Sequence, residues 1–218
     1  RLHEVINGTG VIVHTNLGRA PVSQTAAQAM AEVASRYSPL ELEIATGKRG
    51  GRMSEISEML RLLTGAEASL VVNNNAAAML LTLSALCAGG EVILSRSQAV
   101  EIGGGFRIPD VLAQSGARLV EVGTTNRTYI RDFEAAITPD TAALLTVHWS
   151  NFKIIGFTEQ PRHSELAELA KSRSLPLIED LGSGSLIETT PYGLSHEPTV
   201  MESIAAGVDV GEERGDDR

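Results

Sequence analysis

Residues 70–78 read Leu70-Val71-Val72-Asn73-Asn74-Asn75-Ala76-Ala77-Ala78, an apolar run that ends in three asparagines and continues directly into an Ala/Leu-rich segment. The stretch predicts a short β run followed by a helix to about Ala88. Such a junction directs unpaired backbone N–H groups and the positive end of a helix dipole at one point. Asparagine side chains add caps and hydrogen-bond donors there. The junction therefore predicts a phosphate-binding turn, with an ordinary capped helix as the alternative.

The bulk composition favours a globular protein of the cytoplasm. A chain of 218 residues with 43% hydrophobic content can bury a sizeable core. Its longest apolar run, residues 76–88, is too short to cross a bilayer, and no export signal opens the chain. The single cysteine, Cys87, fits a reducing compartment. A net charge of −9 and 4% aromatic residues argue against binding nucleic acid through a broad basic face.

Apolar strands alternate with helices along most of the chain. Continuous apolar strands separated by helices are typical of an α/β fold with a mostly parallel sheet and helices on both faces. Residues 211–218 contain no apolar side chain, so we expect one domain over residues 1–210 and a polar, disordered tail. The expected strands cover residues 91–95, 118–122 and 142–148 and a run that ends at Asp180; the expected helices cover residues 22–37, 53–63, 108–115 and 164–173, with another beginning near Asp132.

Polar side chains follow several of these strands. Asp180 closes one strand, and Ser150 and Asn151 follow another. The carboxyl ends of parallel strands face the crevice where α/β sheets bind ligands. A carboxylate for a pyridinium proton, a helix terminus for a phosphate and a polar group for a ring hydroxyl are what pyridoxal phosphate requires. The sequence therefore predicts a pyridoxal phosphate site; it predicts no metal site.

A glycine-rich basic loop, residues 47–52, precedes the second helix. Arg49 and Arg52 lie on it, in a chain that is otherwise acidic. Guanidinium groups on such a loop predict an anion clamp. A solvated surface loop is the alternative.

Five runs of sequence are distinctive: TNLGRA (15–20), VVNNNAAA (71–78), EIGG with FRIPD (101–104 and 106–110), VGTTNRT (122–128) and EDLGSGS (179–185). Together they resemble the bacterial selenocysteine synthase family, L-seryl-tRNA(Sec) selenium transferase. They occur in the order found in that family, and the resemblance extends over about residues 5–210.

The resemblance implies the large domain of the aspartate aminotransferase type of fold (fold type I), a cytoplasmic location and a ring-shaped homo-oligomer. It also implies that seryl-tRNA(Sec) is converted into selenocysteyl-tRNA(Sec) with selenophosphate, through a dehydroalanyl intermediate on pyridoxal 5′-phosphate. By position, the phosphate would be held by Asn74, Asn75 and Ala76. The other cofactor-binding residues implied are Gln98 at the ring face, Ser150 and Asn151 near the ring hydroxyl, Asp180 at the ring nitrogen, and Ser183. Arg49 and Arg52 would act in catalysis on the anionic selenium donor.

The chain departs from the family near its end. In the family, the strand that begins at Ala206 continues into a Ser-Gly-Asp-Lys segment whose lysine bonds the cofactor, whereas this chain reads Gly211-Glu212-Glu213-Arg214. Its three lysines all precede Asp180. We therefore expect a chain truncated before that lysine and inactive alone. Two alternatives stay open: another fold-type-I lyase acting on a small amino acid or amino-sugar acid, and a non-catalytic remnant.

Overall fold

The computed structural model describes residues 2–11, 14–103, 105–150, 152–182 and 184–212. Contacts divide the chain into two units, one up to Val71 and one from Val72 onward. Among the described residues, no helix is long and apolar enough to span a bilayer.

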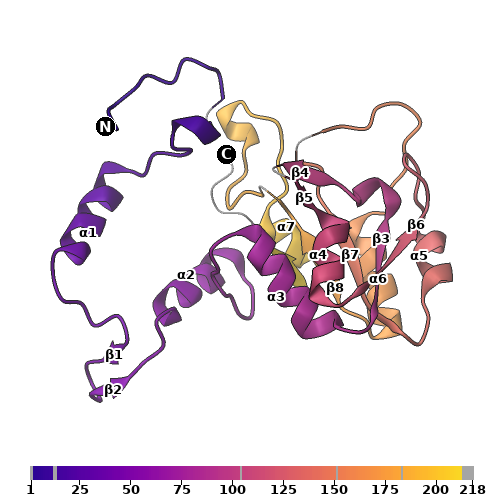
Figure 1. Ribbon diagram of the computed structural model, residues 1–218, viewed down its shortest axis with the longest axis horizontal. Coiled ribbons are helices and arrows are strands. Elements are labelled where there is room, and N and C mark those ends of the chain that lie inside the picture. Colours follow the sequence, from indigo (N-terminus) through magenta and orange to yellow (C-terminus); the bar gives the residue numbers. More distant parts are fainter. Residues whose placement is uncertain (1, 12–13, 104, 151, 183, 213–218) are drawn as a thin grey trace. The chain divides into compact units, whose positions relative to one another are not determined.

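The first unit consists of short elements without a buried core. None of its described residues is buried. The helix α2 nevertheless has an apolar stripe at helical spacing, formed by Ile56, Met59 and Leu63. The elements of this unit, drawn in indigo and violet in Figure 1, are η1 (Thr15–Leu17), α1 (Gln24–Ala34), the antiparallel pair β1 (Leu42–Glu43) and β2 (Lys48–Arg49), and α2 (Ser54–Thr64).

The second unit is built on a five-stranded parallel sheet in the order β6-β3-β7-β8-β9. Its strands are β3 (Glu91–Ser95), β6 (Arg118–Val122), β7 (Thr141–Val147), β8 (Leu177–Asp180) and β9 (Val210–Glu212). A small antiparallel pair, β4 (Glu101–Gly103) and β5 (Phe106–Arg107), stands apart from it. The helices are α3 (Asn75–Cys87), α4 (Ile108–Ser115), α5 (Ile130–Ala136), α6 (His163–Arg173) and α7 (Val200–Ala206), with short 3-10 turns η2 (Arg96–Gln98) and η3 (Thr190–Tyr192).

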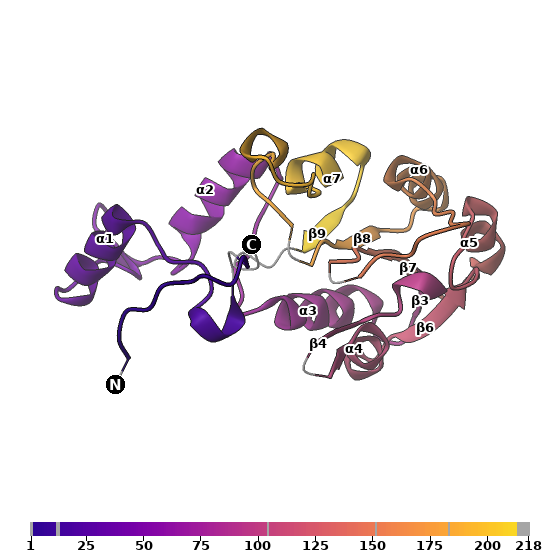
Figure 2. The same cartoon turned by 90° about the horizontal axis from the view of Figure 1, so that it is seen from above.

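Helices cover both faces of the sheet. On one face, side chains of α3 and α4 pack against Leu94 and Leu145. On the other face, side chains of α5 and α6 pack against Ile93 and Leu144. Figure 2 shows this unit nearly edge-on, with α3 and α4 on one side of the strands and α6 and α7 on the other. Neighbouring residues of one strand thus enter different cores, which explains why these strands are apolar throughout.

The strand order places a topological switch point at β3. From β3 the chain passes to β6 on one side, and it then returns to β7 on the other side. The segments that follow β3, β7 and β8 therefore meet at the carboxyl edge of the sheet, where such folds bind ligands. The helix α3 ends just before β3 begins, so its N-terminus points back to this same edge.

The sequence predicted this architecture closely; several bounds differ by one to three residues, as for the helix expected over residues 22–37, and two differences are larger. The strands at residues 91–95 and 118–122 and the helix at residues 108–115 are confirmed to the residue. The apolar run Leu70–Val72, however, forms no strand, and Leu70 is 66% exposed. A strand needs a hydrogen-bonded neighbour, and β-favouring residues alone do not provide one. Conversely, β9 extends two residues into the predicted polar tail, to Glu212.

Candidate active site

Asp180 is the centre of the candidate site. It ends β8, next to Val147 of β7 and Glu212 of β9, and its side chain is fully buried. Its Oδ1 atom accepts hydrogen bonds from Asn75 Nδ2 at 2.9 Å and from the backbone N–H of Gly182 at 2.8 Å. Its Oδ2 atom is buried and has no partner among the described residues.

Burial raises the pKa of Asp180, although the hydrogen bonds from Asn75 and Gly182 act in the opposite direction. A buried carboxylate with an open oxygen is costly unless a donor or a positive charge meets it. The protonated nitrogen of a pyridine ring supplies both. This side chain therefore fits the ring end of pyridoxal phosphate.

The helix α3 joins the asparagine turn directly to this acid. Asn74 is its N-cap and accepts a hydrogen bond from the Ala77 N–H at 2.8 Å. Asn75, the first residue of the helix, directs its amide onto Asp180 rather than into solvent. Ala76 lies in the first turn, where helical geometry leaves backbone N–H groups without intrahelical partners. A buried carboxylate and the unpaired backbone N–H groups of a helix start thus lie at one edge of the sheet, and the residues that join them, Asn75 and Asp180, are 105 positions apart in sequence.

Gln98 and Ser150 reach the same edge from neighbouring strands. Gln98 ends η2 after β3 and donates from Nε2 to Thr146 Oγ1 of β7 at 3.1 Å. Its buried Oε1 atom has no partner in the part of the chain that the structure describes. The Ser150 hydroxyl lies against Gly182, where an added Cβ atom would be 3.3 Å from Ser150 Oγ. Gly182 has a φ of +60°, so a side chain there would be strained as well as crowded. Two other predicted residues, Asn151 and Ser183, lie outside the described residues.

The two arginines of the predicted anion clamp belong to the first unit. Arg49 Nη2 and Arg52 Nε each contact a different oxygen of Glu41, both at 2.6 Å. Arg49 lies on β2 of the short hairpin rather than on an open loop. Two guanidinium groups on one carboxylate leave a net positive charge, which would suit an anion. The role of Arg49 and Arg52 in binding one stays a prediction.

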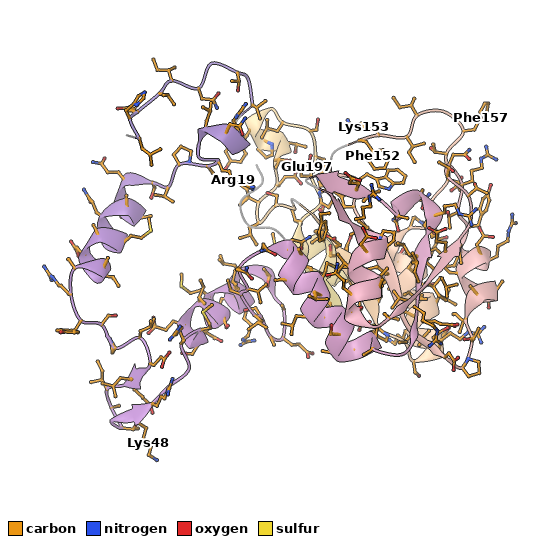
Figure 3. The ribbon with its side chains drawn as sticks, in the orientation of Figure 1. Arg19, Lys48, Phe152, Lys153, Phe157 and Glu197 are labelled. Carbon is orange, nitrogen blue, oxygen red and sulfur yellow. The ribbon has the colours of Figure 1, made fainter. Side chains whose placement is uncertain are left out.

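Sequence reasoning missed several groups at this edge. Glu212 is 5% exposed, and within the described residues neither of its oxygens makes a hydrogen bond of good geometry, although the Thr82 hydroxyl is near. Because it lies in a run without apolar residues, no sequence signal marked it as buried. His148, at the end of β7, has its Nε2 atom 3.7 Å from Glu197. Figure 3 labels Glu197, together with Phe152, Lys153 and Phe157 on the segment that joins β7 to α6.

A surface group of possible metal ligands lies elsewhere in the second unit. Ligand atoms of Glu188, His196 and Glu202 are within 4.8 Å of one another, and all three residues are exposed. The imidazole contacts Glu188 through Nδ1 at 3.3 Å and Glu202 through Nε2 at 3.4 Å. Both ring nitrogens thus already face carboxylates.

The fold is that of the large domain of fold-type-I pyridoxal-phosphate-dependent enzymes. The solved structure of D-glucosaminate-6-phosphate ammonia-lyase has the same fold, with a TM-score of 0.67, 24% identity, and coverage of 89% of this chain and 50% of that one. The aspartate aminotransferase from Thermus thermophilus with maleate also matches, with a TM-score of 0.50, 23% identity, and coverage of 72% and 40%.

The chain belongs to the L-seryl-tRNA selenium transferase family (SelA), whose model matches residues 5–217. It is 54% identical over 215 residues to the L-seryl-tRNA(Sec) selenium transferase of Alkaliphilus oremlandii and 59% identical over 215 residues to that of Desulfotalea psychrophila. Each match covers 99% of this chain but 46% of the relative, so the chain spans about half the length of these proteins. Pyridoxal phosphate is the cofactor that family and fold share.

Proposed function

We propose that residues 72–212 form the cofactor-binding part of a selenium transferase that converts seryl-tRNA(Sec) into selenocysteyl-tRNA(Sec) with selenophosphate. The relatives that carry this name support the reaction. These relatives are 54–59% identical to the chain, which favours selenium transfer over the reaction of an amino-sugar lyase. The likeness to the ammonia-lyase concerns the fold alone. The same support extends to a cytoplasmic location.

One observation carries the proposal: the buried, unpaired Oδ2 atom of Asp180 lies on a carboxylate that is held by the first residue of α3. Pyridoxal phosphate, when bound, supplies an electron sink for charge that develops at a substrate carbon. Asp180 would hold the proton on the ring nitrogen, and a protonated ring accepts that charge more readily. Asn75 and the Gly182 N–H would fix the carboxylate in position.

The remaining residues bind and orient. Asn74 caps the first turn of α3. The backbone N–H groups of Asn75 and Ala76 would bind the phosphate. Gln98 would lie at the ring face, with Ser150 near the ring hydroxyl. Asn151 and Ser183 would add contacts from the same segments. Arg49 and Arg52 would bind the anionic selenium donor through the positive charge that Glu41 leaves uncompensated.

We also propose that the protein is a homo-oligomer. The apolar stripe of α2 supports this, since Ile56, Met59 and Leu63 are 44%, 62% and 61% exposed. Apolar stripes of this kind are normally covered by another surface.

Titration of the chain with pyridoxal phosphate tests the proposed site. Asp180→Asn keeps the oxygen that Asn75 and Gly182 use but replaces Oδ2 by an amide donor. We expect it to weaken binding by about tenfold or more, because a charge-assisted hydrogen bond is lost. Asp140→Asn is the matched control, since Asp140 is 71% exposed and contacts Arg118 instead. Equal affinity of Asp180→Asn and the parent chain would contradict the proposal.

A further inference from the structure

Ser97 holds together the segments that carry two of the cofactor-binding residues. It is 6% exposed and lies in η2, immediately before Gln98. Its hydroxyl accepts a hydrogen bond from Gln160 Nε2 at 2.9 Å, and its carbonyl oxygen accepts one from Trp149 Nε1 at 3.1 Å. Trp149 immediately precedes Ser150. A single residue thus ties down the segment after β7 near both of its ends.

A chain of buried hydroxyl groups anchors Ser97 in turn. Its Oγ atom is 2.8 Å from Ser95 Oγ, which is 2.7 Å from Thr128 Oγ1. Thr128 is fully buried, and its backbone N–H donates to the Glu159 carbonyl at 3.0 Å. Gly123 lies so close that an added Cβ atom there would be 2.2 Å from Thr128 Oγ1. The network therefore connects the ends of β3 and β6 with the segment that leads to α6.

The segment between β7 and α6 is also held by residues that do not belong to the chain of hydroxyl groups. The carbonyl of Phe157 accepts hydrogen bonds from Asn126 Nδ2 at 2.6 Å and from Arg127 Nε at 3.3 Å. The Arg127 guanidinium also lies 5.8 Å from the centre of the Phe157 ring. These contacts fix the exposed part of the segment, whereas Ser97 fixes the ends next to the site.

We propose that Ser97 and Gln160 form a positioning pair that sets the distance between Gln98 and Ser150, and so shapes the pocket for the cofactor ring. Neither residue needs to touch the cofactor. The proposal rests on the proposed function, because Gln98 and Ser150 are cofactor-binding residues only within it. Its physical basis is that buried hydrogen bonds hold one arrangement of the segments that they join, because breaking one of them leaves a buried polar group without its partner.

Three measurements on the chain test the pair. Ser97→Ala removes the acceptor for Gln160, whose buried Oε1 atom already has no partner among the residues that the structure describes. We expect faster amide hydrogen exchange in residues 152–160, measured without cofactor, and pyridoxal phosphate binding that is about tenfold weaker. We also expect a changed visible circular dichroism signal per bound cofactor. Gln160→Met should reproduce these effects, and the double variant should be no worse than either single one.

Ser115→Ala is the matched control. Ser115 is 5% exposed; its hydroxyl donates to the Leu112 carbonyl within α4 and accepts from the Ala117 N–H just after the helix. The Ser115→Ala variant should lose stability as Ser97→Ala does but keep the cofactor affinity and the spectrum of the parent chain. Unchanged exchange in Ser97→Ala would overturn the positioning pair whether or not the chain binds cofactor. Faster exchange with unchanged affinity and spectrum would overturn its role in the site. A parent chain that binds no cofactor would instead refute the proposed function.

Discussion

At the scale of single residues, the site depends on how the two oxygen atoms of the Asp180 carboxylate are used. Asp180 uses Oδ1 for the protein and leaves Oδ2 open, so the side chain is oriented before any ligand arrives. Such preorganisation avoids the cost of ordering the group during binding. Asn75 contributes by donating from α3 to Asp180, which connects the acid directly to the turn that we propose for the phosphate.

Glu212 gives a prediction at this scale. Burial raises the pKa of Glu212 from 4.5 to about 8; the Thr82 hydroxyl opposes this shift, and the charge of Asp180 adds to it to a smaller extent. The folded chain therefore keeps a proton that the unfolded chain releases between these pH values. Stability from this group is complete below pH 4.5 and is lost as the pH rises to about 8, by about 1.4 kcal/mol per pH unit.

Urea unfolding of the parent chain and of Glu212→Gln from pH 5 to pH 8 measures this effect. The variant should show a shallower decline with pH; some decline should remain, because the pKa of Asp180 is raised too. Glu188→Gln is an instructive control. Hydrogen bonds from the Thr190 backbone and side chain, and then from His196, lower the pKa of Glu188 from 4.5 to about 2. Glu188→Gln should therefore change how stability varies with pH only below about pH 4.5, and not between pH 5 and pH 8. Identical slopes for the parent chain and Glu212→Gln would show that Glu212 is not buried in solution.

At the scale of elements, α3 does most to organise the site. Its residues Met79, Leu83 and Cys87 pack into the core, and burial raises the pKa of the Cys87 thiol to about 11. That packing fixes the N-terminus of the helix at the carboxyl edge. A helix dipole and free N–H groups then face the place where an anion would bind.

Substitutions at Asn74 separate the helix cap from the phosphate site. Asn74→Ala loses the hydrogen bond to the Ala77 N–H and should cost about 1 kcal/mol of stability. Asn74→Asp keeps a capping oxygen and should preserve stability, but its negative charge should repel a phosphate. We expect about tenfold weaker pyridoxal phosphate binding for Asn74→Asp, measured by titration beside chemical denaturation. Affinity equal to that of the parent chain would mean that this helix end does not hold the phosphate.

Elements were more predictable from sequence than their contacts. Apolar runs such as residues 118–122 and the Ile108-Pro109 helix start carry their own local signals, and the structure confirms both boundaries. Leu70–Val72 carries an equally strong local signal but forms no strand, because pairing depends on neighbours far away in sequence. The Asn75–Asp180 hydrogen bond spans 105 residues, and no local pattern specifies it. The predicted acid, Asp180, lies at the expected edge, whereas its hydrogen-bond partners and the Ser97 network could not be predicted from the sequence.

At the scale of the whole molecule, the chain combines a well-packed second unit with a first unit whose described residues are all at least partly exposed. It also spans about half the length of its relatives. Its lysines are Lys48 on β2, Lys153 after β7 and Lys171 in the last turn of α6. Because α6 leads into the start of β8, Lys171 lies toward the amino edge, away from the candidate site.

We therefore expect this 218-residue chain to bind pyridoxal phosphate without a covalent bond. The family resemblance places the lysine that bonds the cofactor after Asp180, and this sequence has no lysine there. Treatment of the complex with borohydride, followed by mass spectrometry, should leave the mass of the chain unchanged. A phosphopyridoxyl adduct on Lys153 would contradict this expectation and would assign that side chain to the site; Lys153→Arg would then abolish the adduct.

The central claim is that Asp180 receives the ring nitrogen of pyridoxal phosphate at the carboxyl edge of the sheet. A crystal structure of the chain soaked with the cofactor measures this directly. The account predicts a separation of about 2.7–2.9 Å between Asp180 Oδ2 and the ring nitrogen, with the phosphate at the first turn of α3. A bound cofactor whose ring nitrogen lies more than about 4 Å from that oxygen, or whose phosphate lies away from α3, would contradict it.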